Sequence, residues 1–174
     1  MSQGVNSTPF AQTPMKHGTV TINYTEHASA DALSAADQHL VEEAHAAALR
    51  AYAPYSRFKV GAALRMADGR QVTGNNQENA SFPAGICAER TALHAAMSAN
   101  ADGRVEVMAI IVPSAKGERP VAPCGICRQA LLEQEFRQGG PMRLLMAVPG
   151  GPVVELASAK DLLPFSFDAT FLNP

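Results

Sequence analysis

The first patterned part of the chain has hydrophobic and polar positions that alternate with a helical period. Ser34 is a favourable N-cap residue, and Asp37 follows three positions later, as in a capping box. This start predicts an amphipathic helix from Ser34 to about Tyr52, where Ala53-Pro54 ends it. Apolar residues recur within it at the spacing of one helix face: Leu40, Val41, Ala44, Ala47, Ala48 and Ala51.

Beyond residue 57 the pattern changes to short β-prone runs that alternate with helical segments. Asp68-Gly69 lies between two such runs and predicts a hairpin with strands over 58–66 and 71–76. We expect helices over 87–99 and 125–136, strands over 105–112, 143–148 and 153–157, and a short helix near 159–163. This order predicts an α/β fold in which a mixed five-stranded sheet is flanked by helices.

Residues 1–32 are polar and only weakly patterned, and they are predicted to form an N-terminal extension. Residues 33–174 are expected to form one domain, because a chain of 174 residues that is 47 % hydrophobic can bury a core. No apolar run approaches the roughly 20 residues that span a bilayer, and the extension lacks the continuous apolar stretch of a signal peptide. We therefore expect no membrane association.

The overall charge argues against binding to nucleic acid. The formal net charge is −2, the isoelectric point is near 6.2, and lysines and arginines form no cluster. A domain that grips a nucleic-acid backbone usually carries a basic stripe, so a small-molecule substrate or a protein partner is favoured. The odd number of cysteines, three, predicts reduced thiols and a cytoplasmic location rather than a disulfide framework.

All three cysteines lie at predicted helix starts. Cys87 begins one helix, and Cys124 and Cys127 form a C-x-x-C pair at the start of the next helix. Zinc favours thiolate ligands, and a C-x-x-C turn places two sulfurs on one ion. A third thiolate from the neighbouring helix start would give three protein ligands and leave one position open, as in catalytic zinc sites.

Two charged residues, Glu89 and Arg90, follow Cys87 closely. Glu89 is a candidate proton shuttle, because a carboxyl group beside the open zinc position can take a proton from metal-bound water and pass it on to a substrate. Arg90 is placed to donate hydrogen bonds to the sulfurs and so to offset the negative charge of three thiolates. The pattern C-A-E followed by P-C-x-x-C is a signature of zinc-dependent deaminases.

Two other interpretations of the cysteines are less favoured. A structural zinc site needs a fourth ligand, and the chain has no fourth cysteine. His94 is the only histidine near a motif, but it lies seven residues past Cys87 on the same predicted helix and is expected to face elsewhere. A redox-active C-x-x-C pair would leave Cys87 unexplained and lacks the preceding strand of a thioredoxin-like site.

Five sequence blocks resemble the small cytidine deaminases in order and spacing, from about Ser34 to the C-terminus. The blocks are YAPYSRFKVGAAL (52–64), NQENAS (76–81), CAERTAL (87–93), PCGICRQ (123–129) and LLPFSF (162–167). The resemblance implies a three-layer α/β/α fold and a homotetramer with one Zn²⁺ per subunit. It also implies hydrolytic deamination of cytidine or deoxycytidine to uridine or deoxyuridine, a reaction of pyrimidine salvage.

The same resemblance assigns roles to residues at matching positions. The zinc ligands would be Cys87, Cys124 and Cys127, with Glu89 as the proton shuttle and Arg90 beside the sulfurs. Substrate contacts would come from Phe58 at the pyrimidine, from Asn76 and Glu78 at the ribose 3′-hydroxyl, from Phe167 in a neighbouring subunit's site, and also from Ala88. An amide and a carboxylate suit a sugar hydroxyl, which both donates and accepts hydrogen bonds.

The sequence also departs from the pattern of this family. The N-terminal extension has no counterpart in the shortest members, and Phe82-Pro83-Ala84-Gly85 and Phe165 are expected to reshape the pocket. One alternative is a deaminase of a cytosine-containing antibiotic such as blasticidin S, although in those enzymes the residue after the glutamate is usually not Arg. Another is a non-catalytic zinc-binding assembly module, against which an intact Glu89 argues.

Overall fold

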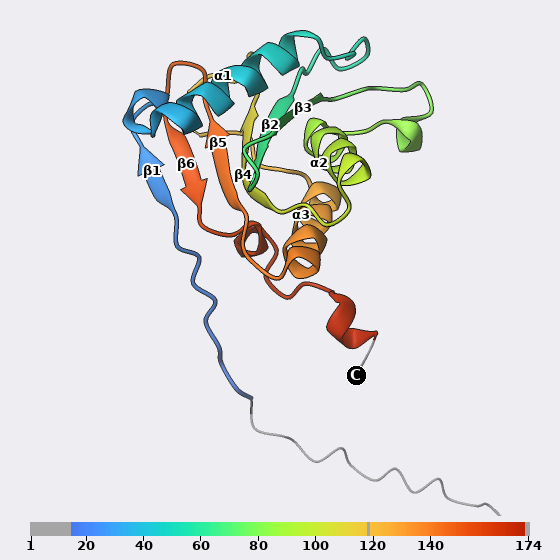
Figure 1. Cartoon of the computed structure of the whole chain (residues 1–174). Coiled ribbons are helices and arrows are strands. Elements are labelled where there is room, and N and C mark those ends of the chain that lie inside the picture. The colour runs from blue at the N-terminus through green and yellow to red at the C-terminus, as the bar shows by residue number, and fades with distance from the viewer. Residues whose placement is uncertain (1–14, 118, 173–174) are drawn as a thin grey trace, which may run out of the picture.

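The computed structural model describes residues 15–117 and 119–172, which build one mixed sheet with helices on both faces (Figure 1). Its strands are β1 (Thr25–His27), β2 (Gly61–Met66), β3 (Gln71–Asn75), β4 (Val105–Ile111), β5 (Arg143–Ala147) and β6 (Val153–Leu156). Its α-helices are α1 (Ala35–Leu49), α2 (Ala88–Ala99) and α3 (Gly125–Gln138). Single 3₁₀ turns add η1 (Ala30–Ala32), η2 (Phe82–Ala84), η3 (Ala159–Leu162) and η4 (Ala169–Phe171).

The sheet has the strand order β1-β6-β5-β4-β2-β3. Strands β4 and β5 run parallel with α3 between them in the chain, and all other neighbouring pairs are antiparallel. The expected α/β fold with a mixed sheet is confirmed, but the sheet has six strands and not the expected five. The additional strand is β1, which lies within the segment that the pattern assigns to the polar extension.

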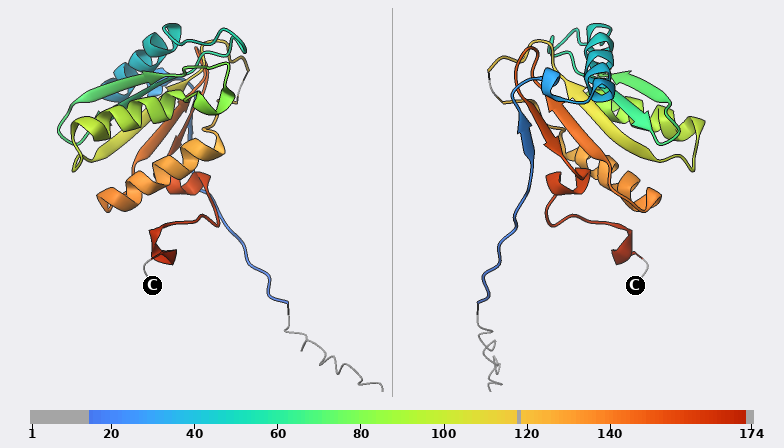
Figure 2. Two further views of the ribbon diagram at one scale, coloured as in Figure 1. Left: turned by 90° about the vertical axis from the view of Figure 1, so that its right-hand side faces the viewer. Right: turned by 60° about the vertical axis from the view of Figure 1, so that its left-hand side comes forward.

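The helices divide between the two faces of the sheet, which gives three layers (Figure 2). On one face α1 packs through Leu40 and Ala44 against apolar residues of the central strands, Ala63, Ala109 and Leu145 among them. Ser34 caps this helix as expected, because its hydroxyl accepts a hydrogen bond from the Asp37 amide at 3.2 Å. On the other face α2 and α3 cover a second core cluster.

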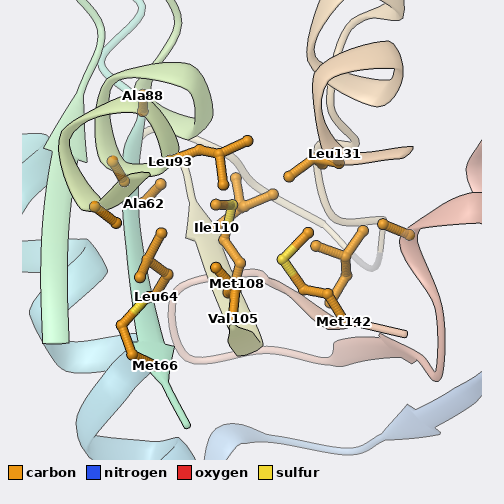
Figure 3. Packing of buried hydrophobic residues seen from close by; sticks show 14 of the residues in the cluster. Ala62, Leu64, Met66, Ala88, Leu93, Val105, Met108, Ile110, Leu131 and Met142 are labelled. Carbon is orange, nitrogen blue, oxygen red and sulfur yellow. The ribbon is translucent and has the colours of Figure 1, made fainter. Parts of the chain in front are cut away.

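The second cluster anchors the start of α2 (Figure 3). Ala88, the first residue of that helix, is fully buried against the sheet together with residues such as Ala62 and Ile110. Gly74 of β3 allows the close approach, since a Cβ at this position would overlap the backbone of Ala88 and Ala92. The residues that flank Ala88 are therefore held in a fixed position relative to the sheet.

A chain of ion pairs crosses the sheet next to the first turn of α1. Buried Asp37 binds Arg65 of β2 at 3.0 Å and Arg143 of β5 at 2.9 Å. Arg143 also binds Glu155 of β6 at 2.8 Å, and Glu155 binds His27 of β1 at 2.8 Å. Burial alone would raise the pKa of Asp37, but hydrogen bonds from Arg143 and Arg65 hold it below its ordinary value. The network thereby ties α1 and β1 to the sheet.

Replacing Asp37 with Asn is expected to lower the free energy of unfolding at pH 7 by roughly 2–4 kcal/mol, because two guanidinium groups lose their shared carboxylate. Since the pKa of Asp37 is lower in the folded chain, its stabilising contribution is present above the unfolded-state pKa and is lost as the pH falls through the folded-state value. Urea unfolding of parent and variant at pH 7 and pH 3 measures both effects.

Asp68→Asn is the matched control, because Asp68 forms an exposed pair with Arg70 in the hairpin turn. Such exposed pairs contribute little, so the control should unfold like the parent. A difference between the parent and Asp37→Asn that stayed the same at both pH values would contradict the assigned ion pairs.

No helix within residues 15–117 and 119–172 combines the length and the apolar character needed to cross a membrane.

Candidate metal centre and active site

The three cysteines meet where α2 and α3 begin. Cys87 is the N-cap residue of α2 and Cys124 the N-cap residue of α3, while Cys127 lies in the first turn of α3. The C-x-x-C turn is anchored by Arg128, whose guanidinium donates to the Pro123 carbonyl at 2.8 Å and to the Leu162 carbonyl at 2.9 Å. Helix N-termini carry partial positive charge, so this location favours thiolates.

The spacing of the sulfurs fits a zinc ion. The Sγ atoms of Cys87 and Cys124 are 3.8 Å apart, those of Cys124 and Cys127 are 3.5 Å apart, and all three lie within 4.8 Å of one another. Sulfurs bound tetrahedrally at the usual Zn–S distance of about 2.3 Å are separated by about 3.8 Å. A disulfide would bring two sulfurs to about 2.0 Å, so these are free thiols.

The sulfurs perturb one another strongly. A hydrogen bond from the Cys127 thiol is the largest cause that lowers the pKa of Cys87 to about 5, and Cys124 and Arg90 add to this effect against burial. The pKa of Cys127 is raised, because its thiol donates to Cys87 and is buried beside the charges of Glu89 and Cys87. Deprotonation of all three thiols at this spacing would need a cation among them, which is the role that a divalent metal would fill.

Glu89 lies next to this cluster and is almost completely buried, with 4 % of its surface exposed. Burial raises the pKa of its carboxyl above the ordinary value, and the negative charge of Cys87 adds to this effect. Its own backbone amide, the Cys127 thiol and Arg90 oppose the shift only in part. A carboxyl group with raised proton affinity beside a metal position can both accept and return protons.

Arg90 faces the same sulfurs from the first turn of α2. Burial would lower its pKa, but hydrogen bonds to Cys87 and Cys127 raise it above the ordinary value, so the guanidinium stays charged. Its Nε atom is buried and has no hydrogen-bond partner within the described ranges. The positive charge is therefore directed at the thiolates, where it offsets part of their negative charge.

A cavity of about 630 Å³ opens at this centre. Cys87 and Arg90 lie on its wall together with Asn76 and Glu78, which are four of the residues singled out from the sequence. Apolar groups complete the wall, with Phe82, Pro83, Ile86 and Ile126 among them. A mostly apolar cavity with a few convergent polar groups is the usual form of a small-molecule site.

Asn76 and Glu78 hold the loop that forms one side of this cavity. The Asn76 side chain accepts from the Val60 amide at 2.8 Å and donates to the Phe58 carbonyl at 2.9 Å. The Glu78 carboxylate accepts from the Tyr55 amide at 2.9 Å and from the hydroxyl of Ser56. The Ser56 hydroxyl is the main cause that lowers the pKa of Glu78. Both side chains therefore fix the loop, a role that the sequence pattern did not indicate.

Comparison with known proteins decides the family. The model of the cytidine and deoxycytidylate deaminase zinc-binding region matches residues 34–138, a range that includes all three cysteines and Glu89. The chain belongs to this family. The resemblance noted from the sequence motifs is thereby confirmed.

Individual members of the family are similar along most of their length. A cytidine deaminase of Halalkalibacterium halodurans is 44 % identical over 136 residues, which cover 78 % of this chain and 97 % of that protein. A cytidine deaminase of Mycobacterium tuberculosis is 43 % identical over 122 residues, 70 % of this chain and 81 % of that protein. The crystal structure of cytidine deaminase from Burkholderia pseudomallei has a TM-score of 0.64 at 41 % identity and covers 74 % of this chain and 97 % of that one.

Other residues to which the resemblance assigns a role lie away from the cavity wall. Ala88 is fully buried in the core cluster at the start of α2, and Phe58 is exposed in the loop before β2. Phe167 is exposed, stacks on Phe171 with ring centroids 5.8 Å apart, and accepts a hydrogen bond from Gln129 of α3 through its carbonyl. Within one chain Phe167 therefore does not line the cavity at Cys87.

The structure also adds residues that sequence reasoning missed. Ile126, inside the C-x-x-C turn, and Tyr55, whose ring packs edge-to-face against Phe82 at 6.3 Å, both line the cavity. The sequence signal that could have indicated Ile126 is a large apolar side chain between two candidate metal ligands. In the structure the Ile126 side chain is 65 % exposed. His94 is exposed, lines a separate groove between α2 and α3, and is absent from the thiol cluster.

Proposed function

We propose that this chain hydrolyses cytidine and deoxycytidine to uridine and deoxyuridine with release of ammonia, as an enzyme of pyrimidine salvage. The observation that carries the proposal is the set of three thiol sulfurs at the spacing of a zinc tetrahedron, with buried Glu89 beside them. Among the described residues this cluster has three members, so a bound ion keeps a position for water.

In this proposal Cys87, Cys124 and Cys127 hold one Zn²⁺ per subunit. Zinc bound to three protein ligands lowers the pKa of a water molecule toward neutrality, which supplies a nucleophile at physiological pH. Arg90 keeps the site from becoming too negative for that purpose, because its charge faces the thiolates.

Glu89 moves the protons of the reaction. Its carboxylate takes a proton from the attacking water and delivers one to N3 of the ring, while a C–O bond forms at C4. Glu89 then takes the remaining proton from the C4 hydroxyl and passes it to the amino group, so that the C4–N bond breaks as the C4 carbonyl forms, and ammonia leaves. The raised pKa of Glu89 suits this cycle, since the group must both accept and release a proton near neutral pH.

Asn76 and Glu78 are proposed to bind the ribose 3′-hydroxyl. Both side chains already bind the backbone of the 55–60 loop. Asn76 retains a second amide proton to donate, and the Glu78 carboxylate retains lone pairs that can accept. Phe58 is proposed to contact the pyrimidine, and fully buried Ala88 is proposed to hold its neighbours Cys87 and Glu89 in place for the substrate. Exposed Phe167 is proposed to enter the cavity of a neighbouring subunit in a homotetramer. The free thiols fit a cytoplasmic enzyme.

Substrate selectivity tests the nucleoside assignment. We expect kcat/KM for cytidine to exceed that for free cytosine by about 10²-fold or more, because the base leaves the polar pair at the ribose position unmatched. Deoxycytidine should resemble cytidine, since both carry the 3′-hydroxyl. Faster turnover of blasticidin S than of cytidine would overturn the nucleoside assignment in favour of an antibiotic-modifying enzyme.

A further inference from the structure

The segment Lys16–Glu26, here called the arm, is exposed and has the pattern of a strand. Val20, Ile22 and Tyr24 alternate with polar residues and are 55 %, 43 % and 61 % exposed. The arm runs away from the domain in Figure 1. The family match begins at residue 34, so the arm lies outside it.

The arm continues directly into β1, which is an edge strand. Only Thr25–His27 pair with β6, and within the described residues no strand lies on the other side of β1. No charged residue occurs between His17 and Glu26 to protect this edge. An uncovered edge with a regular apolar pattern is a template for pairing with another strand.

We infer that the arm pairs antiparallel with the arm of a second copy of this chain, about a two-fold axis at Thr21. In this register residues 16 and 26, 18 and 24, and 20 and 22 lie opposite each other across the axis. Antiparallel neighbours directly opposite each other point to the same face, so each arm contributes the same set of contacts.

In the paired arms, the face formed by the even-numbered residues is apolar in its centre and carries one ion pair at each end. Val20 lies opposite the partner's Ile22, and Tyr24 lies opposite the partner's Gly18, where the missing side chain leaves room for the ring. Lys16 lies opposite the partner's Glu26, and both residues are exposed in the single chain. Charge complementarity therefore favours a second copy of this chain as the occupant.

The odd-numbered face becomes uniformly polar. Thr21 lies opposite its own symmetry mate, Thr19 lies opposite the partner's Asn23, and His17 lies opposite the partner's Thr25. A cross-strand Thr–Thr pair such as the one at Thr21 stabilises a sheet. The two faces thus separate into apolar and polar, as in a strand that is covered on one side.

Other registers lose one of these features. A shift of the axis to Ile22 places Glu26 opposite the partner's Gly18 and removes the ion pair, while a shift by one residue places apolar side chains opposite polar ones. Residues 20–22 of the arm also border a small cavity of about 170 Å³ with Leu163–Ser166 of their own chain. That contact leaves both Val20 and Ile22 largely uncovered.

Cysteine cross-linking of the zinc-loaded full chain tests the register. Opposite residues in an antiparallel pair are separated by about 4.5–5.5 Å between Cα atoms, which is within disulfide range. Thr21→Cys should therefore form a covalent dimer with oxidised glutathione as the oxidant. Thr19→Cys is the matched control, because its symmetry mate lies four residues along the strand, roughly 14 Å away. The parent sets the background from Cys87, Cys124 and Cys127, and peptide mass analysis identifies the bridge.

We expect the Thr21→Cys dimer to form at least about tenfold faster than the Thr19→Cys dimer. Adding Lys16→Glu to Thr21→Cys should slow the cross-link through like-charge repulsion, and adding Glu26→Lys as well should restore it. Equal rates for the two cysteine variants would overturn the inference, as would indifference to Lys16→Glu. If the arm instead packs on the C-terminal segment of its own chain, neither variant would form the cross-link, and this result would also overturn the inference. The readout does not depend on catalysis, so it stands apart from the proposed function.

Discussion

Glu89→Gln is expected to lower kcat for cytidine by about 10²–10⁴-fold, the usual contribution of a positioned acid–base group. Gln has nearly the same shape as Glu, so it should fill the buried space behind Cys87 without disturbing the packing of α2. It cannot accept a proton from water or return one to the ring and the amine. The zinc content and the thermal midpoint should therefore stay close to those of the parent.

The measurement is steady-state kinetics together with metal analysis and a thermal unfolding curve. Glu42→Gln is a matched control, because Glu42 is an exposed glutamate of α1 on the opposite face of the sheet, and its kcat should not change. Activity of Glu89→Gln within tenfold of the parent, with zinc bound, would rule out the assigned proton shuttle. It would favour the alternative of a zinc-binding assembly module.

Cys127→Ser is expected to remove zinc and, with it, all measurable turnover. Cys127 is fully buried beside Cys124, and among the described residues the metal-binding group contains only the three cysteines, with no fourth ligand to replace one of them. Loss of a hydrogen-bond partner of a ligand alone costs about 10–100-fold in metal affinity. We therefore expect loss of the ligand itself to cost more than about 100-fold.

Metal analysis after dialysis against a weak chelator checks this expectation. The thermal midpoint should also fall, because zinc binding stabilises the folded chain and the deprotonated thiols. Removing zinc from the parent with a strong chelator should reproduce the loss of activity, and added zinc should restore the parent but not the variant. One equivalent of tightly bound zinc in Cys127→Ser would contradict the three-thiolate site.

Local sequence signals predicted most of the elements. The Ser34 cap, the Asp68-Gly69 turn and the β-branched run before residue 112 each determine structure within a few residues of themselves, and each element was found where expected. Strand β1 was not predicted, because Thr25–His27 is polar throughout and the alternating apolar residues Val20, Ile22 and Tyr24 lie just before it. It forms through pairing with β6 and through the contact between His27 and Glu155, 128 residues away.

The candidate site likewise contains residues that local sequence predicts and contacts that only the tertiary structure shows. The cysteines and Glu89 were found because ligand type, spacing and helix starts are local features, and the fold then brings the two helix starts together. The contacts of Asn76 and Glu78 with the 55–60 loop depend on tertiary structure, and so does the anchoring of the C-x-x-C turn by Arg128. No local pattern could have indicated them.

Ammonia release from cytidine, with the matching change in ring absorbance, is the direct measurement of the proposed hydrolysis. It should be made on purified full-length protein that contains one zinc per subunit. We expect ammonia and uridine to appear in equal amounts and chelation of the zinc to stop the reaction. A folded, zinc-loaded chain that releases no ammonia from either cytidine or deoxycytidine would contradict the proposed hydrolysis.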